Sequence, residues 1–500
     1  MFFTSGKYML FLAVVFFLYW TVAGHRRTRT ILLLVASYYF YALWNWKFLA
    51  LIILISTVDF LTARFIAGSE SHAKRKLLLW TSVLTDIGAL FTFKYFNFFS
   101  SSTSGIVNVI QPWLTSAITS ISNLLHVQPP AAILDYLSTE TEPFVLHVAL
   151  PLGLSFITFR SLSYVIDVYR KQMKPTTSFL DYQTFVAFFP TVIAGPVVRA
   201  KELLPQLNAP SKLTSEEGTQ AIFLIMLGLI KKIAIADYLA NNLVGRVFDQ
   251  PQLYSSVETL AAVYGYALQI YCDFSGYSDI AIGSALLLGY KLPVNFNAPY
   301  RAVNLPDFWK RWHITLSNWL TDYVYFSIGG LRKRQFNMYR NVVLTMLIGG
   351  LWHGAAWTFV IWGGMHGLGL AVNRWWENRR RSLKRKPRQQ WWIKAICVFA
   401  TFHFVCLTWV FFRASSLEQA WEVLKRFGAL NFDAGNLQWP VITMLVLGYL
   451  SHWFPQNALE RVRAGWTWLP APVQAVLILS VGVGLYYLSS AEVQFIYGNF

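Results

Sequence analysis

Three histidines lie among tryptophan, glycine and leucine in the stretch 301–370, and they are the side chains best suited to chemistry. His313 ends the run 307–313, which reads Asp-Phe-Trp-Lys-Arg-Trp-His. His353 and His366 follow in Leu-Trp-His-Gly-Ala and Trp-Gly-Gly-Met-His-Gly contexts. An imidazole can act as a general base on an alcohol, or as a nucleophile, near neutral pH. In surroundings this apolar, an ionisable side chain is a candidate functional group.

The spacing of the histidines limits what they can do together. His313 and His353 occupy different segments, so they could converge on one site. His353 and His366 would lie about 140° apart around one ideal helix, so we do not expect them to share a face. Two or three buried histidines could also bind a metal ion, but no carboxylate stands at ligand spacing and no metal site is predicted. The other alternative is that the rings only join helices by hydrogen bonds.

The elements that must position these rings belong in a membrane. The 500-residue chain is 55% hydrophobic and only 13% charged. We count about eleven apolar runs, several of which reach the roughly 20 residues needed to cross a bilayer. The predicted fold class is therefore all-α, a polytopic integral membrane protein with transmembrane or re-entrant helices. The first run is interpreted as a retained span, and the lipid bilayer is an expected partner.

The net charge of +18 does not indicate nucleic acid as a partner. The basic residues cluster between apolar runs, as in residues 25–29 and 74–76. Such clusters mark cytoplasmic loops. Residues 101–144 contain no lysine or arginine, which places them on the far side. The middle of that stretch, 106–125, is either an interfacial helix or a plain connecting loop.

Several apolar runs carry signs of interruption. The sequence Trp-Asn-Trp-Lys at 44–47 separates two helices, Pro151 and Gly153 interrupt the run 145–169, and Pro190 breaks the run 185–198. Broken helices are tolerated in a membrane only where protein or water satisfies the freed backbone groups. In the long run 258–290, side chains four apart share a helix face, which pairs Asp273 with Tyr277 and Ser275 with Asp279.

The segment between Arg340 and Arg374 can be placed in the membrane in two ways. Both flanking arginines are expected to be cytoplasmic. A straight helix of that length measures roughly 50 Å, whereas two crossings need about 60 Å. Either this segment is re-entrant, with His353 near mid-depth, or one basic cluster is not a cytoplasmic loop. Several glycines between 349 and 369 permit breaks and close helix contact.

The motifs around the histidines resemble the signatures of the membrane-bound O-acyltransferase family. The run 308–317, followed by Asp-Tyr at 322–323 and Gly-Gly at 329–330, is similar to one signature, and 351–355 with 362–367 is similar to the second. The branch resembles bacterial alginate O-acetyltransferases and their polysaccharide-acetylating relatives. The resemblance extends from Ala36 to about Ala420. Supporting runs are 273–279, 296–300, Gly195-Pro196, Lys231-Lys232 with Asp237, and 411–414.

This resemblance implies roles for particular residues. His353 would be the catalytic histidine and His313 the second functional one, whereas packing between helices is favoured for His366. The helices are expected to surround a central tunnel. Its candidate lining and donor-binding residues are Trp309, Trp312, Ser317, Trp352, Asp273 and Tyr277. Asp273 and Asp279, with Arg160, are favoured as a buried polar network; relatives tend to carry glutamine where this chain has Arg160.

The whole chain, 1–500, is expected to form one membrane-bound O-acyltransferase domain. Its core would be 145–375, with N-terminal helices in 8–100 and C-terminal helices in 392–489. No permanently bound cofactor is expected. The basic clusters at 332–334 and 379–388 could attract a phosphorylated donor, although loop orientation is the favoured explanation.

The expected reaction moves an acetyl group from a cytoplasmic thioester donor, acetyl-CoA, across the bacterial inner membrane. The acceptor would be an extracytoplasmic polysaccharide such as alginate, with a periplasmic acetyltransferase as partner. Three alternatives stay open. One is D-alanyl transfer to teichoic acid from a carrier protein. Another is a lipid or protein acyltransferase. The last is a transporter without covalent chemistry, which would show paired broken helices in corresponding halves.

Overall fold

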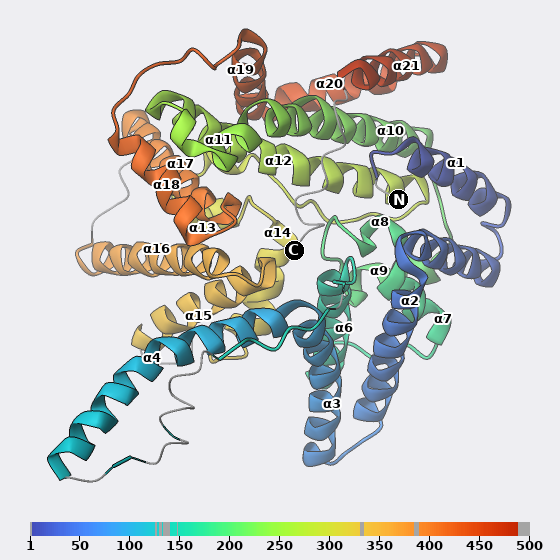
Figure 1. Ribbon diagram of the computed structural model, residues 1–500. Helices are drawn as coiled ribbons and strands as arrows, with labels where there is room; N and C mark the ends of the chain where they lie inside the picture. Colours follow the sequence, from blue (N-terminus) through green and yellow to red (C-terminus); the bar gives the residue numbers. More distant parts are fainter. Residues whose placement is uncertain are drawn as a thin grey trace. The chain divides into compact units, whose positions relative to one another are not determined.

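The structure is a computed structural model that describes residues 3–125, 128–129, 133, 141–147, 149–330, 335–384 and 390–488. Within these ranges the chain forms helices and connecting segments without a β-strand, so the all-α prediction is confirmed (Figure 1). The contacts divide the chain into two compact units, one made of 1–83 with 152–500 and the other of Leu84–Pro151.

The first unit contains nearly all the helices. Its first half comprises α1 (Gly6–Thr21), α2 (Arg26–Ala67), most of α3 (His72–Leu90), α6 (Leu154–Tyr169), α7 (Phe179–Ala187), α8 (Phe189–Val192), α9 (Ala200–Asn208), α10 (Ser215–Leu229), η2 (Ile230–Asp237), η3 (Ala240–Val244), α11 (Gly245–Asp249) and η4 (Pro251–Leu253). Its second half comprises α12 (Ser256–Leu287), η5 (Pro299–Arg301), α13 (Leu305–Trp309), α14 (Ile314–Trp319), η6 (Leu320–Tyr325), α15 (Gln335–His353), α16 (Trp357–Ser382), α17 (Trp391–Arg413), α18 (Leu417–Gly428), α19 (Trp439–Trp453), α20 (Gln456–Trp468) and α21 (Ala471–Leu488).

Four helical stretches in the described part of the chain are long and apolar enough to cross a membrane. They are Arg26–Ala67, His72–Ser120, Trp391–Arg413 and Ala471–Leu488. Other predicted apolar runs fall in helices outside these four stretches. The run 222–236, for example, is divided between α10 and the π-helical segment η2. The run 258–290 falls in the 32-residue helix α12.

The predicted kink in α2 is confirmed. Asn45 has an extended backbone (φ −161°, ψ 110°) inside an otherwise helical stretch. Its side-chain oxygen accepts a hydrogen bond from the Lys47 amide at 3.0 Å. This local bond supplies an acceptor at a point where the helical ladder is interrupted.

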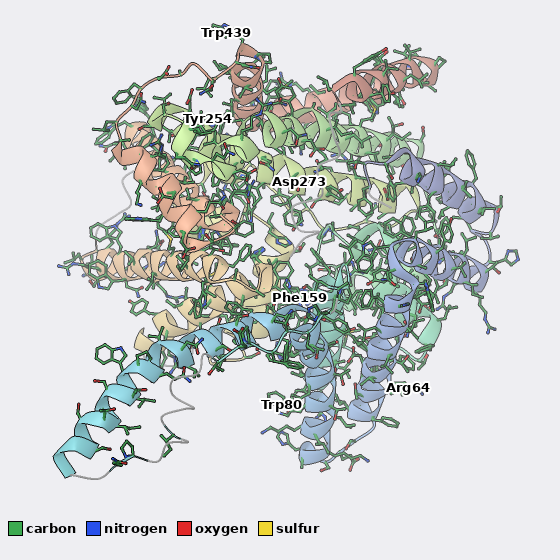
Figure 2. The ribbon with its side chains drawn as sticks, in the orientation of Figure 1. Arg64, Trp80, Phe159, Tyr254, Asp273 and Trp439 are labelled. Atoms are coloured by element: carbon green, nitrogen blue, oxygen red, sulfur yellow. The ribbon has the colours of Figure 1, made fainter. Side chains whose placement is uncertain are left out.

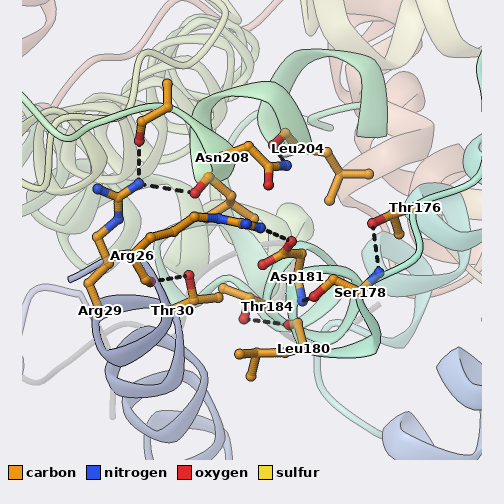
Figure 3. A network of polar contacts seen from close by, with 12 residues as sticks. Arg26, Arg29, Thr30, Thr176, Ser178, Leu180, Asp181, Thr184, Leu204 and Asn208 are labelled. Carbon is orange, nitrogen blue, oxygen red and sulfur yellow. Dashed lines mark hydrogen bonds and ion pairs between the residues drawn. The ribbon is translucent and has the colours of Figure 1, made fainter.

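The beginning of α2 is tied to α7 and α9 (Figure 3). Arg26 Nη2 lies 2.5 Å from the Asp181 carboxylate on α7. Arg29 Nη2 donates to the carbonyls of Leu207, at 3.1 Å, and of Ala209 at the end of α9. A guanidinium that reaches the last carbonyls of a helix satisfies acceptors that the helix itself leaves open.

The predicted break in the run 185–198 is also present, because α7 ends at Ala187 and α8 begins at Phe189. Arg160 of α6 is buried beside this break, and its guanidinium donates to the Val186 carbonyl at 2.9 Å and to the Thr191 carbonyl. The arginine therefore supplies donors to backbone oxygens at the point where the helix is broken. Its contacts are to backbone carbonyls, so Arg160 is a buried polar residue but does not join the expected network with Asp273 and Asp279.

The centre of the first unit is α12, which packs closely along α10 (Figure 1). A Cβ atom built on Gly228 would lie 2.5 Å from the Gly276 carbonyl oxygen, and one built on Gly276 would lie 2.7 Å from the Gly228 oxygen. Small residues therefore let the two backbones touch, as at many contacts between membrane helices. One side of α12 thereby faces α10 and η2, and another faces the histidines.

The second unit contains the end of α3, η1 (Phe91–Tyr95) and α4 (Phe96–Leu125). Residues 106–125 are helical, which supports the helix alternative over the plain loop. Its interfacial position stays a prediction. Asn108 Oδ1 accepts from the Thr141 amide at 2.8 Å, which joins α4 to the returning chain. Much of 126–140 lies outside the described residues, as do the basic cluster 332–334 and residues 385–389 of the last cluster.

Candidate active site

His313 lies in the connection between α13 and α14, and its backbone is unusual. Its φ of 42° and ψ of 55° put it in the left-handed region. Few residues other than glycine adopt this conformation, and those that do are often found at functional sites. The His313 side chain is wholly buried, and its ring contacts the Phe274 ring of α12 at 4.6 Å between centroids.

Asn295 binds the backbone just after His313. The Ile314 amide donates to the Asn295 carbonyl oxygen at 3.0 Å. The Asn295 side-chain oxygen accepts from Thr315, at 3.3 Å from the amide and 2.9 Å from the hydroxyl. Because Asn295 is itself buried, this clamp fixes the chain at the point where His313 takes its strained conformation.

The Thr315 hydroxyl extends the clamp to a third segment. It accepts a hydrogen bond from the Val197 amide at 2.9 Å. The Asn295 side-chain nitrogen lies 3.3 Å from the Ser278 hydroxyl on α12. Four segments that are distant in sequence thus meet behind His313, and none of these polar contacts has a spacing that sequence inspection would reveal. Asn295 and Thr315 are therefore the positioning residues that the sequence-based prediction missed.

His353 is the last residue of α15, and the chain turns sharply after it into α16. A Cβ atom on Gly354 would lie 2.1 Å from the Phe359 ring, so a larger residue does not fit at this turn. The two helices then run side by side, because a Cβ on Gly350 would lie 2.3 Å from the Phe359 carbonyl oxygen and one on Gly363 2.4 Å from the Met346 oxygen. The predicted close contact through glycines is confirmed. This helical hairpin also supports the re-entrant alternative.

The three histidine rings belong to one aromatic cluster in which tryptophans separate them. The Trp352 ring lies 6.0 Å from the His313 ring and 4.8 Å from the His353 ring. The Trp362 ring lies 5.0 Å from His353 and 4.9 Å from His366. His313 and His353 therefore converge, with Trp352 between them. We call these five residues the His–Trp cluster.

His366 contacts the same tryptophan as His353, Trp362, which the sequence did not predict. The expectation assumed one straight helix, whereas the turn at 354–356 places the two residues on antiparallel helices. His366 Nε2 lies 2.9 Å from the Thr408 hydroxyl on α17. That hydroxyl donates to the Val405 carbonyl at 2.7 Å. It therefore accepts from His366, which assigns the proton to Nε2. This bond joins α16 to α17.

The α6 helix forms the other side of the Trp352 pocket. Phe159, which is labelled in Figure 2, stacks on Trp352 with 5.0 Å between ring centroids and on Trp319 with 4.0 Å. The Trp319 indole N–H donates to the Phe159 carbonyl at 3.0 Å. Aromatic rings in these stacked and edge-on arrangements contribute about 1 kcal/mol each beyond their burial. The orientation of Trp352, and through it of both histidines, is thus fixed by several elements.

The other candidate lining residues lie in two different places. Trp309 contacts Trp362 at 5.8 Å and His366 at 5.3 Å, so it belongs beside the His–Trp cluster. Trp312 stacks on Phe308 at 5.7 Å, and the Ser317 hydroxyl donates to the Trp312 carbonyl at 3.3 Å. The central tunnel itself, and any donor contact to these side chains, stay predictions.

Asp273 and Tyr277 lie against η2 through Lys232. Lys232 Nζ lies 2.6 Å from Asp273 and 2.7 Å from Asp237, and it sits 5.8 Å from the Tyr277 ring centroid. The next residue, Lys231, lies 2.6 Å from Asp279. We call the five charged residues Lys231, Lys232, Asp237, Asp273 and Asp279 the ion cluster. Its geometry matches the buried polar network favoured for Asp273 and Asp279.

Within the described part of the chain, no group of three or more His, Cys, Asp or Glu side chains is arranged to hold a metal ion. The three cysteines are free thiols, of which Cys272 and Cys406 are buried.

The chain matches one protein family over most of its length. The model of the membrane-bound O-acyltransferase family matches residues 39–413. The chain is 32% identical to a peptidoglycan O-acetyltransferase of Helicobacter pylori over 94% of this chain and 91% of that protein. It is 39% identical to a probable alginate O-acetylase of Pseudomonas aeruginosa, over 89% and 80%. A teichoic acid D-alanyltransferase of Streptococcus thermophilus is 31% identical over 55% of this chain and 70% of its own length.

Proposed function

The chain belongs to the membrane-bound O-acyltransferase family, and from this premise we propose that it moves an acetyl group from acetyl-CoA across the membrane for the O-acetylation of an extracytoplasmic polysaccharide. The location would be the bacterial inner membrane, and a periplasmic acetyltransferase would complete the transfer. The O-acetylating relatives match along 89–94% of this chain, whereas the D-alanyltransferase relative matches 55%. This difference in coverage favours acetyl over D-alanyl transfer.

The single observation that carries the proposal is the position of His353. It stands at the end of α15, in the matched region, with Trp352 and Trp362 against its ring. In the proposed step, a nitrogen of His353 takes the proton of the acceptor hydroxyl. The oxygen attacks the carbonyl carbon of the thioester, the C–S bond breaks, and the thiolate takes the proton from the imidazolium.

His313 would orient the acyl carbonyl on the other side of Trp352. Its strained backbone and the Asn295 clamp support this role, because a fixed ring can hold a carbonyl without reorganising during the reaction. His353 is 2% exposed and His313 is buried. Substrates therefore have to displace neighbouring aromatic side chains, and Trp352 and Phe412, both within 5.2 Å of the His353 ring centroid, are the first candidates.

The decisive experiment uses the full chain purified in detergent, reconstituted with labelled acetyl-CoA, a periplasmic acetyltransferase and an exopolysaccharide. We expect label on the polysaccharide with the wild type and none above background with His353→Ala. His25→Ala is the matched control, because His25 is exposed at the start of α2 and lies outside the cluster. Equal transfer by wild type and His353→Ala would remove this residue from the chemistry.

The transporter alternative makes a different prediction in the same preparation. A transporter without covalent chemistry would release intact donor or acceptor across a vesicle membrane, and His353→Ala would leave that movement unchanged. If labelled D-alanyl carrier protein donates and acetyl-CoA does not, the D-alanyl alternative replaces the proposal.

A further inference from the structure

A cavity of about 810 Å³ lies within the first unit, away from the His–Trp cluster. It is bounded by the turn from α2 to α3 and by the connection from α6 to α7. The residues that matter for its chemistry are Ser69, Glu70, Arg75, Lys171, Gln172 and Lys174. Its volume falls within the range of small-molecule binding sites, about 300–1,000 Å³.

The lining is strongly basic. Arg75, Lys171 and Lys174 contribute three cations, against the one carboxylate of Glu70. These cations come from two segments that are about a hundred residues apart in sequence and converge here only because of the fold. A basic cluster that merely orients a loop needs no such convergence.

Arg75 is held in place. Its Nη2 donates to the Tyr169 carbonyl at 2.5 Å, and the guanidinium carbon lies 5.3 Å from the Tyr169 ring centroid. Its Nε is buried and has no hydrogen-bond partner among the described residues. The buried Nε is out of reach of a ligand, so a ligand oxygen in the cavity would bind the terminal nitrogens of the guanidinium, as arginine does with phosphate.

The opposite rim of the cavity is already ordered by hydrogen bonds within the protein. The Gln172 amide donates to the Asp167 carbonyl at 2.8 Å and the Lys171 amide to the Val168 carbonyl at 3.0 Å. Lys171 adopts a φ of 60° in this turn, a conformation that non-glycine residues rarely take. The turn therefore presents its lysines in a fixed arrangement, and a ligand does not have to order the loop.

The cavity adjoins the end of one candidate span, Arg26–Ala67, and the start of another at His72. Because basic clusters stand on both of its rims, we expect it on the cytoplasmic side. A cavity at that level is reached by the phosphates of lipid headgroups and by phosphorylated solutes of the cytoplasm.

We propose that this cavity binds a phosphate group, with Arg75, Lys171 and Lys174 as its ligands. Two sources share this chemistry. One is the headgroup of an anionic phospholipid, and the other is the nucleotide part of the acyl donor. Only the second source depends on the acetyl-CoA reaction proposed above.

The test measures binding and needs no acyl transfer. The full chain is purified in neutral detergent. Its affinity for adenosine 3′,5′-bisphosphate is measured by equilibrium dialysis, and its affinity for phosphatidylglycerol by titration in nanodiscs against a phosphatidylcholine background. The main variant is Lys171→Gln/Lys174→Gln. Arg75→Gln is the second variant, and Lys174→Gln is kept in case either of these fails to fold. Arg27→Gln is the matched control, because Arg27 is an exposed cation of another basic cluster.

We expect one of the two probes to bind the wild type and the control alike. The double variant should weaken that binding about tenfold or more, since each lysine near the membrane surface contributes about 1 kcal/mol. Loss of the lipid arm would identify a headgroup site, and loss of the bisphosphate arm a donor site. No binding of either probe to the wild type would overturn the proposal. So would an equal loss in Arg27→Gln. His353→Ala should bind as the wild type does, which separates this proposal from the reaction.

Discussion

The two sides of α12 carry two different kinds of buried titratable groups. On the side of η2, charges are neutralised by opposite charges, with Lys232 within 2.7 Å of both Asp237 and Asp273. On the other side, Phe274 leads into the His–Trp cluster, where the rings of His313 and His353 are surrounded by aromatic neighbours. A buried ion pair is stable only while both partners are present. A histidine can exchange a proton near neutral pH, which makes it better suited to chemistry than a paired lysine and aspartate.

From this contrast, we expect the ion cluster to stabilise the fold and the His–Trp cluster to carry out the proposed reaction. Removing a member of the ion cluster should lower stability and leave the activity per folded molecule largely unchanged. Removing His353 should do the reverse. The predictions below test this division, beginning with the largest expected effect.

The largest effect is expected for His353→Gln. Glutamine keeps much of the volume of the ring but cannot act as a base, so we expect acetyl transfer to fall about a thousandfold, in the range that general-base catalysis supplies. The melting temperature in detergent should change little. Rates from the reconstituted assay and thermal unfolding followed by tryptophan fluorescence provide the two measurements. A His353→Gln protein with much lower stability and normal activity per folded molecule would show that His353 stabilises the fold and does not act in the reaction.

The ion cluster should respond in the opposite way. Lys232→Ala leaves Asp273 buried without its cation, and we expect a loss of about 3 kcal/mol or more in unfolding free energy. Thermal unfolding and yield in detergent measure this loss. The double substitution Lys232→Met/Asp273→Leu removes the buried Lys232–Asp273 pair and leaves only the more exposed Asp237 without its cation, so it should recover part of the loss. A stable Lys232→Ala protein that lacks activity would place the ion cluster in the chemistry.

The sequence was sufficient for features that depend on local pattern. The kink at Asn45 and the long helix α12 followed from runs of neighbouring residues. Features that depend on distant contacts could not be predicted in this way. The shared contact of His353 and His366 with Trp362 requires the turn after Gly354, and a helical wheel cannot represent a turn.

The residues that hold His313 in place could not be predicted from the sequence, for the same reason. Asn295 lies in a loop just before the run 296–300, and nothing in its own residue type or spacing marks it as a positioning residue. Its role follows only from its hydrogen bonds to the backbone of residues 314 and 315. The carbonyl acceptors of Arg160 likewise could not be named before the break between α7 and α8 was placed. The residues that could carry out chemistry were therefore predictable from the sequence, whereas the residues that hold them in position were not.

Substitutions of Asn295 test whether the position of His313 matters for acetyl transfer. Asn295→Ala removes the acceptor for Thr315, so the His313 backbone should relax and acetyl transfer should fall about thirtyfold, as when a catalytic group is misplaced by about 1 Å. Asn295→Asp keeps the accepting oxygen and should restore most of the rate. Because His313 is proposed to orient the acyl carbonyl, the loss should appear in kcat more than in KM. Equal losses in Asn295→Ala and Asn295→Asp would show that the side-chain oxygen is not what positions His313.

The smallest effect is expected for His366, which belongs to the His–Trp cluster by position but resembles the ion cluster in having a fixed partner. Its Nε2 donates to Thr408 across two helices. Glutamine can place an N–H near the same point, so His366→Gln should keep acetyl transfer within about threefold of the wild type and lower stability by about 1 kcal/mol, the usual effect of a weakened hydrogen bond. His366→Ala should cost more stability, because it also removes the ring between Trp309 and Trp362. The same two assays decide the outcome. If His366→Gln folds normally but loses acetyl transfer as His353→Gln does, proton exchange in this cluster is shared among the histidines, and the fixed hydrogen bond to Thr408 is not a sign of a structural role.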